Sequence, residues 1–435
     1  MEITNKKHQL FIIILSILPL SIIIGSTISL INVLLVNLII LVILIEERKF
    51  FILKNITTKM LFILFLYLIL NLLISLNFEY SMARNLGFIR LILLFFAINY
   101  LFYYLKWKTV IKVWMIVISI LLVDVYIEIY TRSNLAIDQI NYNKADLREY
   151  ASVLTLFNSE YILKEEYGNR IVSFFKDEPV VGAYLLGFSF LLFGYLLNTY
   201  KNKKLISILF LLLSVFAVLM TGERSNTIKF FIGIFVIFIF LDHIKFKTKL
   251  FFLALFFFLS ILIVNQSSYL KNRYINQFYD NFTSQEKFIK FSEKNIYFVI
   301  YKSGLEVFKK YPIFGVGNKN YRVETCENNI KKANKHYLCT THPHQIYLEL
   351  LSEHGIVGTT ILISIFFILL FKIIKQILIS RNYIQICSFA YVLVTFIPIL
   401  PSGSFFGDFN STLFWINFSI MFASHKNTNI FTKIG

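Results

Sequence analysis

Residues 27–45 read TISLINVLLVNLIILVILI, nineteen consecutive positions without a charged side chain. A run of about 18 or more apolar residues is long enough for a helix to cross the hydrocarbon core of a bilayer. Membrane β-barrels show short segments of alternating polarity instead, and this run is continuous. The stretch therefore predicts a transmembrane helix.

Similar apolar runs recur along the whole chain, which is 57% hydrophobic and only 16% charged, whereas soluble domains carry about 25% charged residues. These runs predict an all-α polytopic membrane protein, a single integral-membrane domain over 1–435 with about twelve transmembrane helices. The predicted spans are 9–25, 27–45, 60–77, 86–104, 109–130, 179–197, 204–220, 227–241, 250–264, 347–371, 384–400 and 405–423.

The distribution of basic residues predicts the orientation of these spans. The net charge is +18, which in a soluble protein would raise the possibility of nucleic-acid binding, but most of it lies in alternate short loops. The loops of the other set are nearly free of lysine and arginine, apart from Arg84 and Arg224. Because cytoplasmic loops are the basic ones, we expect both termini in the cytoplasm.

Two segments on the expected outer side are long, 131–178 and 265–346. The second is predicted to be mostly helical and holds thirteen basic and six acidic residues, a net charge of +7. A basic surface beside the membrane attracts phosphate-bearing lipids or glycans. The alternative is a solvated face that reflects a general lysine bias.

The most informative stretch is CTTHPHQIYLELLSEHGIVG, residues 339–358, which runs from the large loop into an apolar span. His344 stands where the polar loop gives way to the helix, so it could meet a membrane-borne substrate. A neutral imidazole can accept a proton from a sugar hydroxyl as a general base. The alternative is that His342 and His344 are ordinary loop residues that cap the helix.

A metal site is a further reading of His342-Pro-His344. Catalytic zinc takes about three protein ligands and structural zinc four. His336, Cys326 and Cys339 are nearby, but no standard ligand spacing is present, so we expect neither a metal nor a cofactor. Cys326 and Cys339 share one outer loop and could form a disulfide in an oxidising compartment.

Arginines at the outer ends of spans are the second set of candidates. Arg224 lies in TGERSN, residues 221–226, a short outer turn where basic residues are otherwise rare. Its guanidinium could hold a diphosphate at two points, or Glu223 could hold it in a structural pair. Arg90 lies inside a span, where ionisable residues are commonly functional but can also pair. Weaker candidates of the same kind are Arg84, Arg170 and Lys302.

The segment YPIFGVG, residues 311–317, is a turn signal. The residues before it, 294–311, mix apolar and basic side chains and could form an interfacial helix. The Gly-x-Gly pattern at 315–317 does not follow a soluble strand, so we reject a dinucleotide site.

These motifs resemble those of the superfamily of O-antigen ligases and O-antigen polymerases. The resemblance extends over roughly residues 80–425. The ligase pattern is His, then Asn, Ser or Gln, nine residues, Gly, two residues and a small residue or Tyr. His344, Gln345, Gly355 and Gly358 match it in full. Residues 312–317 resemble the family's Pro-x-x-Gly-x-Gly turn, and 221–226 its arginine turn. Residues 170–179 resemble a degraded form of a further family segment.

The resemblance implies a metal-independent, inverting glycosyltransferase in the bacterial inner membrane, with its active site facing the periplasm. The donor would be a glycan on undecaprenyl diphosphate. A ligase would transfer it to lipid A-core and a polymerase to another lipid-linked repeat, with ligase the favoured reading and no nucleic-acid partner. On this reading His344 is the catalytic base and Arg224 binds the donor diphosphate. A Cys326–Cys339 disulfide would cross-link the outer loop that presents His344.

The remaining candidates are also given expected roles. Substrate-binding roles fall to His342, Gln345, Arg90, Lys302 and Arg170, and structural roles to Gly315, Gly317, Gly355 and Gly358.

The chain departs from the family at one arginine. Many ligases have a second arginine at the start of the helix before the Pro-x-x-Gly-x-Gly turn, and this chain has Tyr297 there by spacing. Lys294 or Lys302 could supply the charge but not the planar fork of a guanidinium.

Two readings from other classes compete with transfer. A twelve-span transporter or flippase would place its charged residues near the bilayer midplane and show repeated halves. Here the unusual polar residues lie at the outer edge, and the two halves do not look alike. A structural membrane protein would tolerate replacement of His344 or Arg224.

Overall fold

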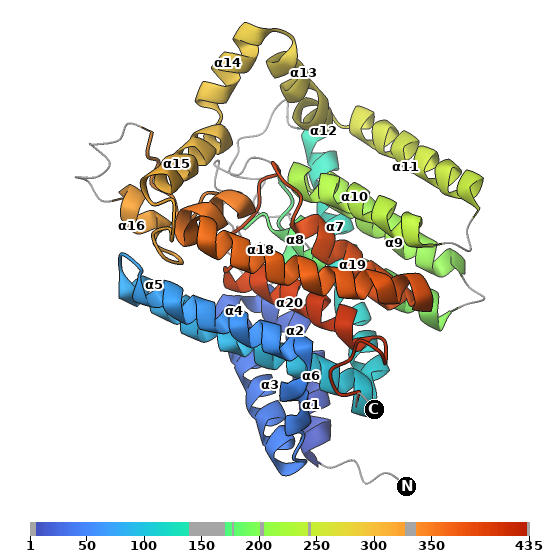
Figure 1. Ribbon diagram of the computed structural model, residues 1–435. Helices are drawn as coiled ribbons and strands as arrows, with labels where there is room; N and C mark the ends of the chain where they lie inside the picture. The colour runs from blue at the N-terminus through green and yellow to red at the C-terminus, as the bar shows by residue number, and fades with distance from the viewer. Residues whose placement is uncertain are drawn as a thin grey trace. The chain divides into compact units, whose positions relative to one another are not determined.

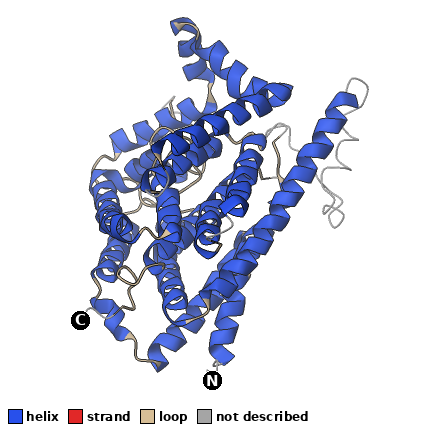
Figure 2. Cartoon of the chain, turned by 90° about the vertical axis from the view of Figure 1, so that its right-hand side faces the viewer, coloured by secondary structure: helices blue, strands red, loops and turns tan. Residues whose placement is uncertain are grey.

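The computed structural model describes residues 6–138, 170–175, 178–200, 204–241, 245–326 and 336–432 (Figure 1). The regular elements among them are helices and short helical turns, as Figure 2 shows. The chain divides into two compact units. Unit 1 is Met1–Leu35, Leu105–Phe278 and Arg381–Val394, and unit 2 is Val36–Tyr104, Tyr279–Ser380 and Thr395–Gly435.

Unit 1 collects helices from the start of the sequence, from its middle and from one segment in its last quarter. They are α1 (Lys6–Ser16), α2 (Leu18–Ile24), the start of α3 (Ser26–Glu46), α7 (Trp107–Asp138), η6 (Ser173–Phe175), α8 (Val181–Thr199), α9 (Lys204–Met220), α10 (Arg224–Phe240), α11 (Phe246–Gln266), α12 (Ser268–Lys271), the π-turn η7 (Asn272–Asn276) and α19 (Tyr383–Thr395).

Helix α8 is the buried centre of unit 1 and packs against α9 and α10. It also passes close to α19, because a Cβ at Gly194 would lie only 2.6 Å from the backbone oxygen of Tyr383. Polar side chains tie the neighbouring helices together. Trp114 Nε1 donates to the carbonyl of Leu15 at 3.0 Å, and the Tyr184 hydroxyl donates to that of Pro19 at 2.9 Å.

Unit 2 contains the remaining helices. They are the rest of α3, η1 (Phe50–Lys54), α4 (Ile56–Leu73), α5 (Phe78–Asn85), η2 (Leu86–Phe88), α6 (Ile89–Tyr104), α13 (Gln277–Phe282) beyond its first two residues, α14 (Gln285–Lys294), α15 (Ile296–Lys310), α16 (Tyr321–Cys326), α18 (Ile346–Ser380) and α20 (Asp408–Ala423). Helix α20 packs on α6, while α18 packs on α4 and α15.

Aromatic rings fill the core of unit 2 around α18 and α20. Phe366 of α18 contacts Phe414 and Phe418 of α20 with ring centroids 5.4 and 5.8 Å apart. Phe405, in the segment before α20, packs on Phe366 and Phe414 as well. This burial fixes α18, and with it the loop that precedes α18.

The predicted spans are confirmed as helices, but only in part as membrane spans. Each predicted span falls on a helix or a bent helix pair. Among the described residues, seven helices are long and apolar enough to cross a membrane, or eight if the pair α1 and α2, bent by 43°, is one span. Helices α9, α10, α19 and α20 are shorter, with 17, 17, 13 and 16 residues. The protein is a multi-pass helical membrane protein, and the number twelve stays a prediction.

The two long segments also have helical parts. Helix α7 continues beyond the predicted span to Asp138, and residues 139–169 of the segment 131–178 lie outside the described residues. The described part of 265–346 holds α12 to α16, and the predicted interfacial helix at 294–311 is α15. Its position relative to a membrane stays a prediction.

Candidate active site

The start of α18 fixes the position of His344. Gln345 is the last residue before the helix, and its side-chain oxygen accepts the N–H of Leu348 at 2.8 Å, so it serves as the N-cap. His344 has a φ of +52°, a left-handed backbone that is uncommon for a residue with a side chain. Its carbonyl accepts the N–H of Ser402 at 2.9 Å. Residues that the surrounding structure keeps in such an uncommon backbone conformation cluster at functional sites.

A buried carboxylate holds the segment that contacts His344. Glu349, on the first turns of α18, is 1% exposed. It accepts the Ser404 hydroxyl at 2.5 Å and the Phe405 N–H at 2.8 Å. Because Ser402 is two residues from Ser404, Glu349 also positions the donor to the His344 carbonyl. Glu349 was not among the predicted site residues.

The predicted glycine turn packs directly on a kink in α18. Gly355 has a φ of +61° and breaks the helix. The freed N–H groups of Ile356 and Val357 donate to the carbonyls of Pro312 and Ile313 at 2.8 and 3.1 Å. A Cβ at Gly355 would collide with the backbone of Ile313. The turn and the helix therefore meet backbone to backbone, as only glycine allows.

The other predicted glycines also lie where another segment approaches too closely for a side chain. The N–H of Gly317 donates to the carbonyl of Glu353 at 2.9 Å, and a Cβ at Gly317 would collide with Ser75. A Cβ at Gly315, which has a φ of +70°, would meet the backbone of Glu353. A Cβ at Gly358 would collide with the Tyr67 hydroxyl. All four glycines thus have structural positions.

A disulfide closes the loop before the histidines. Cys326, at the end of α16, is bonded to Cys339, thirteen residues on. The Ser303 hydroxyl of α15 accepts the N–H of Leu338 at 3.1 Å and the Tyr321 hydroxyl at 2.6 Å. These contacts anchor both sides of the bridge to α15 and so limit the freedom of the segment that leads to His344.

The two histidine rings lie against each other, with centroids 3.9 Å apart. Thr341 Oγ1 lies 2.9 Å from His342 Nδ1. Within the described residues no group hydrogen-bonds the ring of His344, whose other ring neighbour is Tyr297 at 6.2 Å. Burial lowers the pKa of His344 below its ordinary value of 6.5, and burial followed by the charge of His344 lowers the pKa of His342 to about 3. Both imidazoles are therefore neutral at pH 7.

Unit 2 also holds a group of basic side chains. Arg84 and Arg90 both form ion pairs with Asp408, Arg84 at 3.0 Å. Of the two roles expected for an arginine inside a span, function or pairing, the structure thus shows pairing for Arg90. Burial, followed by the charges of Arg84 and Arg322, lowers the pKa of Lys319. The Nε of Arg322 is buried without a hydrogen-bond partner among the described residues. The partly buried carboxylate of Asp408 thus pairs with two arginines, and its charge also acts on Lys319.

A second arginine cluster lies in unit 1, made of Arg170, Arg224 and Arg273. Nη1 of Arg224 donates to the carbonyl of Arg273 at 3.4 Å, and Nε of Arg273 donates to the carbonyl of Gly222. Burial, with the charges of Arg170 and Arg224 among the further causes, lowers the pKa of Arg273. Three cations close enough to repel one another would be stabilised by an anion.

Glu223 lies beside this cluster but forms no ion pair with its arginines. Its carboxylate accepts the Gly182 N–H and the Asn226 amide, both at 2.6 Å, instead of pairing with Arg224. Burial raises its pKa to about 7, against the opposing effects of these hydrogen bonds and of Arg170. Among the described residues none of the three arginines has a carboxylate within ion-pairing distance, and Arg170 Nε and the Tyr269 hydroxyl are buried without a partner.

Arg273, like Glu349, was not among the predicted site residues, because it was counted only among the basic residues of the large loop. One signal marked it: lysine strongly outnumbers arginine in this chain, so an arginine close after a span is unusual. The candidates Lys294, Tyr297 and Lys302 lie at the end of α14 and on α15 in unit 2. Tyr297 faces His344, while Lys302 lines a cavity described below.

The described residues contain no cluster of three or more His, Cys, Asp and Glu side chains that could hold a metal ion. Metal independence stays a prediction.

Residues 208–363 match the family described as O-antigen ligase. The matched region contains the arginine turn at 221–226, the glycine turn and the whole of the His344 motif. No curated protein matches the chain. The region 208–363 is therefore similar to the O-antigen ligase family, which supports the resemblance of this chain to the superfamily of O-antigen ligases and polymerases.

Proposed function

We propose that this protein is a glycosyltransferase that moves a glycan from undecaprenyl diphosphate to an acceptor hydroxyl, as an O-antigen ligase with lipid A-core as the acceptor. The observation that carries the proposal is His344. Its imidazole is neutral, half-buried and without a hydrogen-bond partner among the described residues, and it lies in the matched region at the start of α18.

In the proposed reaction the acceptor oxygen attacks the anomeric carbon of the donor sugar. The bond from this carbon to the diphosphate oxygen breaks, and undecaprenyl diphosphate leaves. The hydroxyl proton passes to His344, a contribution of roughly 10²–10⁴-fold for a positioned base. A single displacement inverts the configuration at the anomeric carbon. We assign no step to a metal.

The leaving diphosphate needs a partner of opposite charge. We assign this role to Arg224, together with Arg170 and Arg273, because these three guanidinium groups lack ion-pair partners among the described residues. Arginine suits this task because its planar fork binds phosphate oxygens at two points. Charge that develops on a leaving group is stabilised best by such preformed donors.

The proposed location is the bacterial inner membrane, with both termini in the cytoplasm and His344 facing the periplasm. Two observations support this orientation. The short loops obey the positive-inside rule, and the Cys326–Cys339 bridge needs an oxidising compartment such as the periplasm.

Polymerisation of lipid-linked repeats is the second candidate function. The observation that favours it is Tyr297, which stands where many ligases have a second arginine. The two candidates share the donor and the base and differ in the acceptor.

The lipopolysaccharide ladder of a strain that lacks this protein separates the two functions. Bare lipid A-core, with long polymer left on the lipid carrier, indicates a ligase. Core capped by a single repeat indicates a polymerase. Complementation with wild type should restore the ladder, and complementation with His344→Ala should not. An unchanged ladder in the deletion strain would contradict both functions for this glycan.

A further inference from the structure

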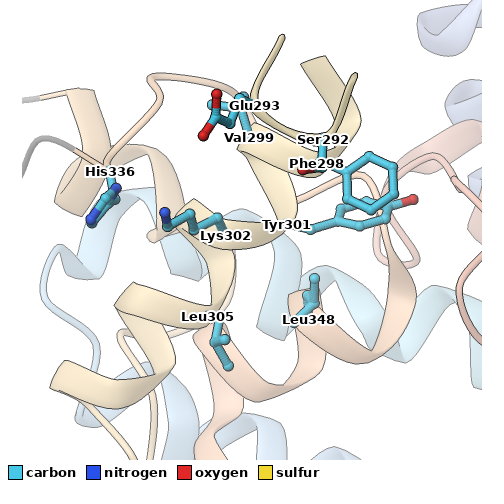
Figure 3. A pocket seen from close by; sticks show the side chains of 9 residues that line it. All are labelled: Ser292, Glu293, Phe298, Val299, Tyr301, Lys302, Leu305, His336 and Leu348. Carbon is cyan, nitrogen blue, oxygen red and sulfur yellow. The ribbon is translucent and has the colours of Figure 1, made fainter. Parts of the chain in front are cut away.

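A cavity of about 610 Å³ opens in unit 2 beside α15. Helix α14 and the start of α15 form its upper wall, and Leu348 of α18 lies at its base (Figure 3). Its volume falls within the range of about 300–1,000 Å³ that is typical of small-ligand sites. The mechanism proposed above does not use it.

The lining of the cavity has two different sides. In Figure 3 the rings of Phe298 and Tyr301 lie together on one side, whereas Lys302 and Glu293 present charged groups on the other. Phe298 is a large apolar side chain that is nevertheless 38% exposed. An exposed aromatic surface beside hydrogen-bonding groups fits a sugar ring, which has an apolar C–H face and a rim of hydroxyls. Carboxylate oxygens accept from hydroxyls, and an ammonium donates to them.

The cavity lies within one helical turn of the His344 segment. Gly304 of α15 allows the close approach, because a Cβ there would lie 3.0 Å from Pro343 Cβ and 3.4 Å from Leu348 Cβ. Tyr301, which lines the cavity, is four residues after Tyr297, whose ring faces His344. Residues four apart share a face of a helix, so one aromatic face of α15 leads from His344 to the cavity.

We infer that this cavity binds a sugar residue of the acceptor glycan, next to the residue whose hydroxyl His344 deprotonates. The inference rests on the proposed function and deepens it. The acceptor, rather than the donor, is assigned here because the base must contact the acceptor hydroxyl, and the cavity adjoins the base within one unit. Both acceptors considered above, lipid A-core and a lipid-linked repeat, present such a sugar.

The test is a transfer assay on the full-length protein in detergent, with the acceptor and the donor varied separately. Lys302→Gln and Glu293→Gln remove one charge each without removing core packing. Phe298→Leu reduces the aromatic surface but keeps an apolar side chain. Lys309→Ala is the matched control, because Lys309 is on the same helix, 59% exposed, and pairs with Glu306 outside the cavity.

We expect each cavity variant to raise the KM for the acceptor about five- to tenfold, the effect of losing one hydrogen bond to a charged group or part of an aromatic contact. The KM for the donor and the kcat at saturating acceptor should stay within about twofold, as for a residue that contributes only to acceptor binding. Parallel assays with lipid A-core and with a lipid-linked repeat show which of them uses the cavity.

Two results would overturn the inference. One is an unchanged acceptor KM in all three variants with both acceptors, and the other is a rise in the donor KM alone. Either result is separate from failure of the proposed function, because His344→Ala is measured in the same assay. A loss of transfer in His344→Ala with unchanged cavity variants would reject the acceptor site and leave the transferase intact.

Discussion

The side chain of Arg224 is hydrogen-bonded to the backbone of Arg273 in unit 1: Nη1 of Arg224 donates to the carbonyl of Arg273 at 3.4 Å. Their side chains carry like charges, and burial and neighbouring cations lower the pKa of Arg273. An arrangement that brings cations together costs free energy unless an anion binds there. It therefore supports a diphosphate site assembled from the turn at 221–226 and from η7.

The first prediction concerns Arg273. Arg273→Ala should lower kcat/KM for the lipid-diphosphate donor about 10²-fold, the effect of removing one preformed donor to a developing negative charge. Arg273→Lys should recover only part of the loss, because lysine keeps the charge without the planar fork. Lys271→Ala is the control, since Lys271 is an exposed cation two residues away. Wild-type kinetics in Arg273→Ala would remove this residue from the donor site.

The second prediction tests the contact between Gly358 and Tyr67. Gly358→Ala should destabilise the protein by about 1–3 kcal/mol, the usual cost of overpacking, because the new methyl group meets the Tyr67 hydroxyl. Tyr67→Leu removes both the hydroxyl and the ring carbon that the methyl group meets, so Gly358→Ala should cost less thermal stability in that background. The measurement is the midpoint of thermal unfolding in detergent. Purely additive effects of the two substitutions would show that the contact is absent.

The third prediction concerns the Cys326–Cys339 bridge. A maleimide should label neither cysteine before reduction and both after it, in a Cys387→Ser background that removes the buried free thiol. Cys326→Ser should lower the free energy of unfolding by about 3 kcal/mol, the entropic value of a loop of this length. Labelling of both thiols without reductant would contradict the bridge.

The fourth prediction is the pH dependence of transfer. Only the neutral form of His344 can accept a proton, and burial lowers its pKa below 6.5. Activity should therefore persist at pH 6.5 and fall only as the pH drops further through the lowered pKa. The measurement is a profile of kcat/KM against pH from about 4.5 to 8, because kcat/KM reports the pKa of groups in the free protein. An acid limb with a midpoint at or above 6.5 would contradict a buried neutral base.

The sequence predicted the local features of the site better than its long-range ones. The motif around His344 was informative because its residues act locally: Gly355, predicted to be structural, breaks the helix with a positive φ, and Gln345, predicted to bind substrate, caps the start of the helix. Apolar runs predicted the helices because the length and composition of a run are also local properties of the sequence. The packing of Gly315 on Glu353 and the support from Glu349 depend on segments far apart in the chain. No local pattern encodes such pairings, which is why Glu349 was missed.

The central claim is that His344 is the base of a glycan transfer, and a single kinetic comparison tests it most directly. Wild type, His344→Ala and the cavity control Lys309→Ala are purified, shown to have the same unfolding temperature, and assayed with a glycan on undecaprenyl diphosphate and lipid A-core. The account predicts that His344→Ala lowers kcat at least about 10²-fold, with Lys309→Ala at the wild-type rate. Turnover by His344→Ala at the wild-type rate would contradict it.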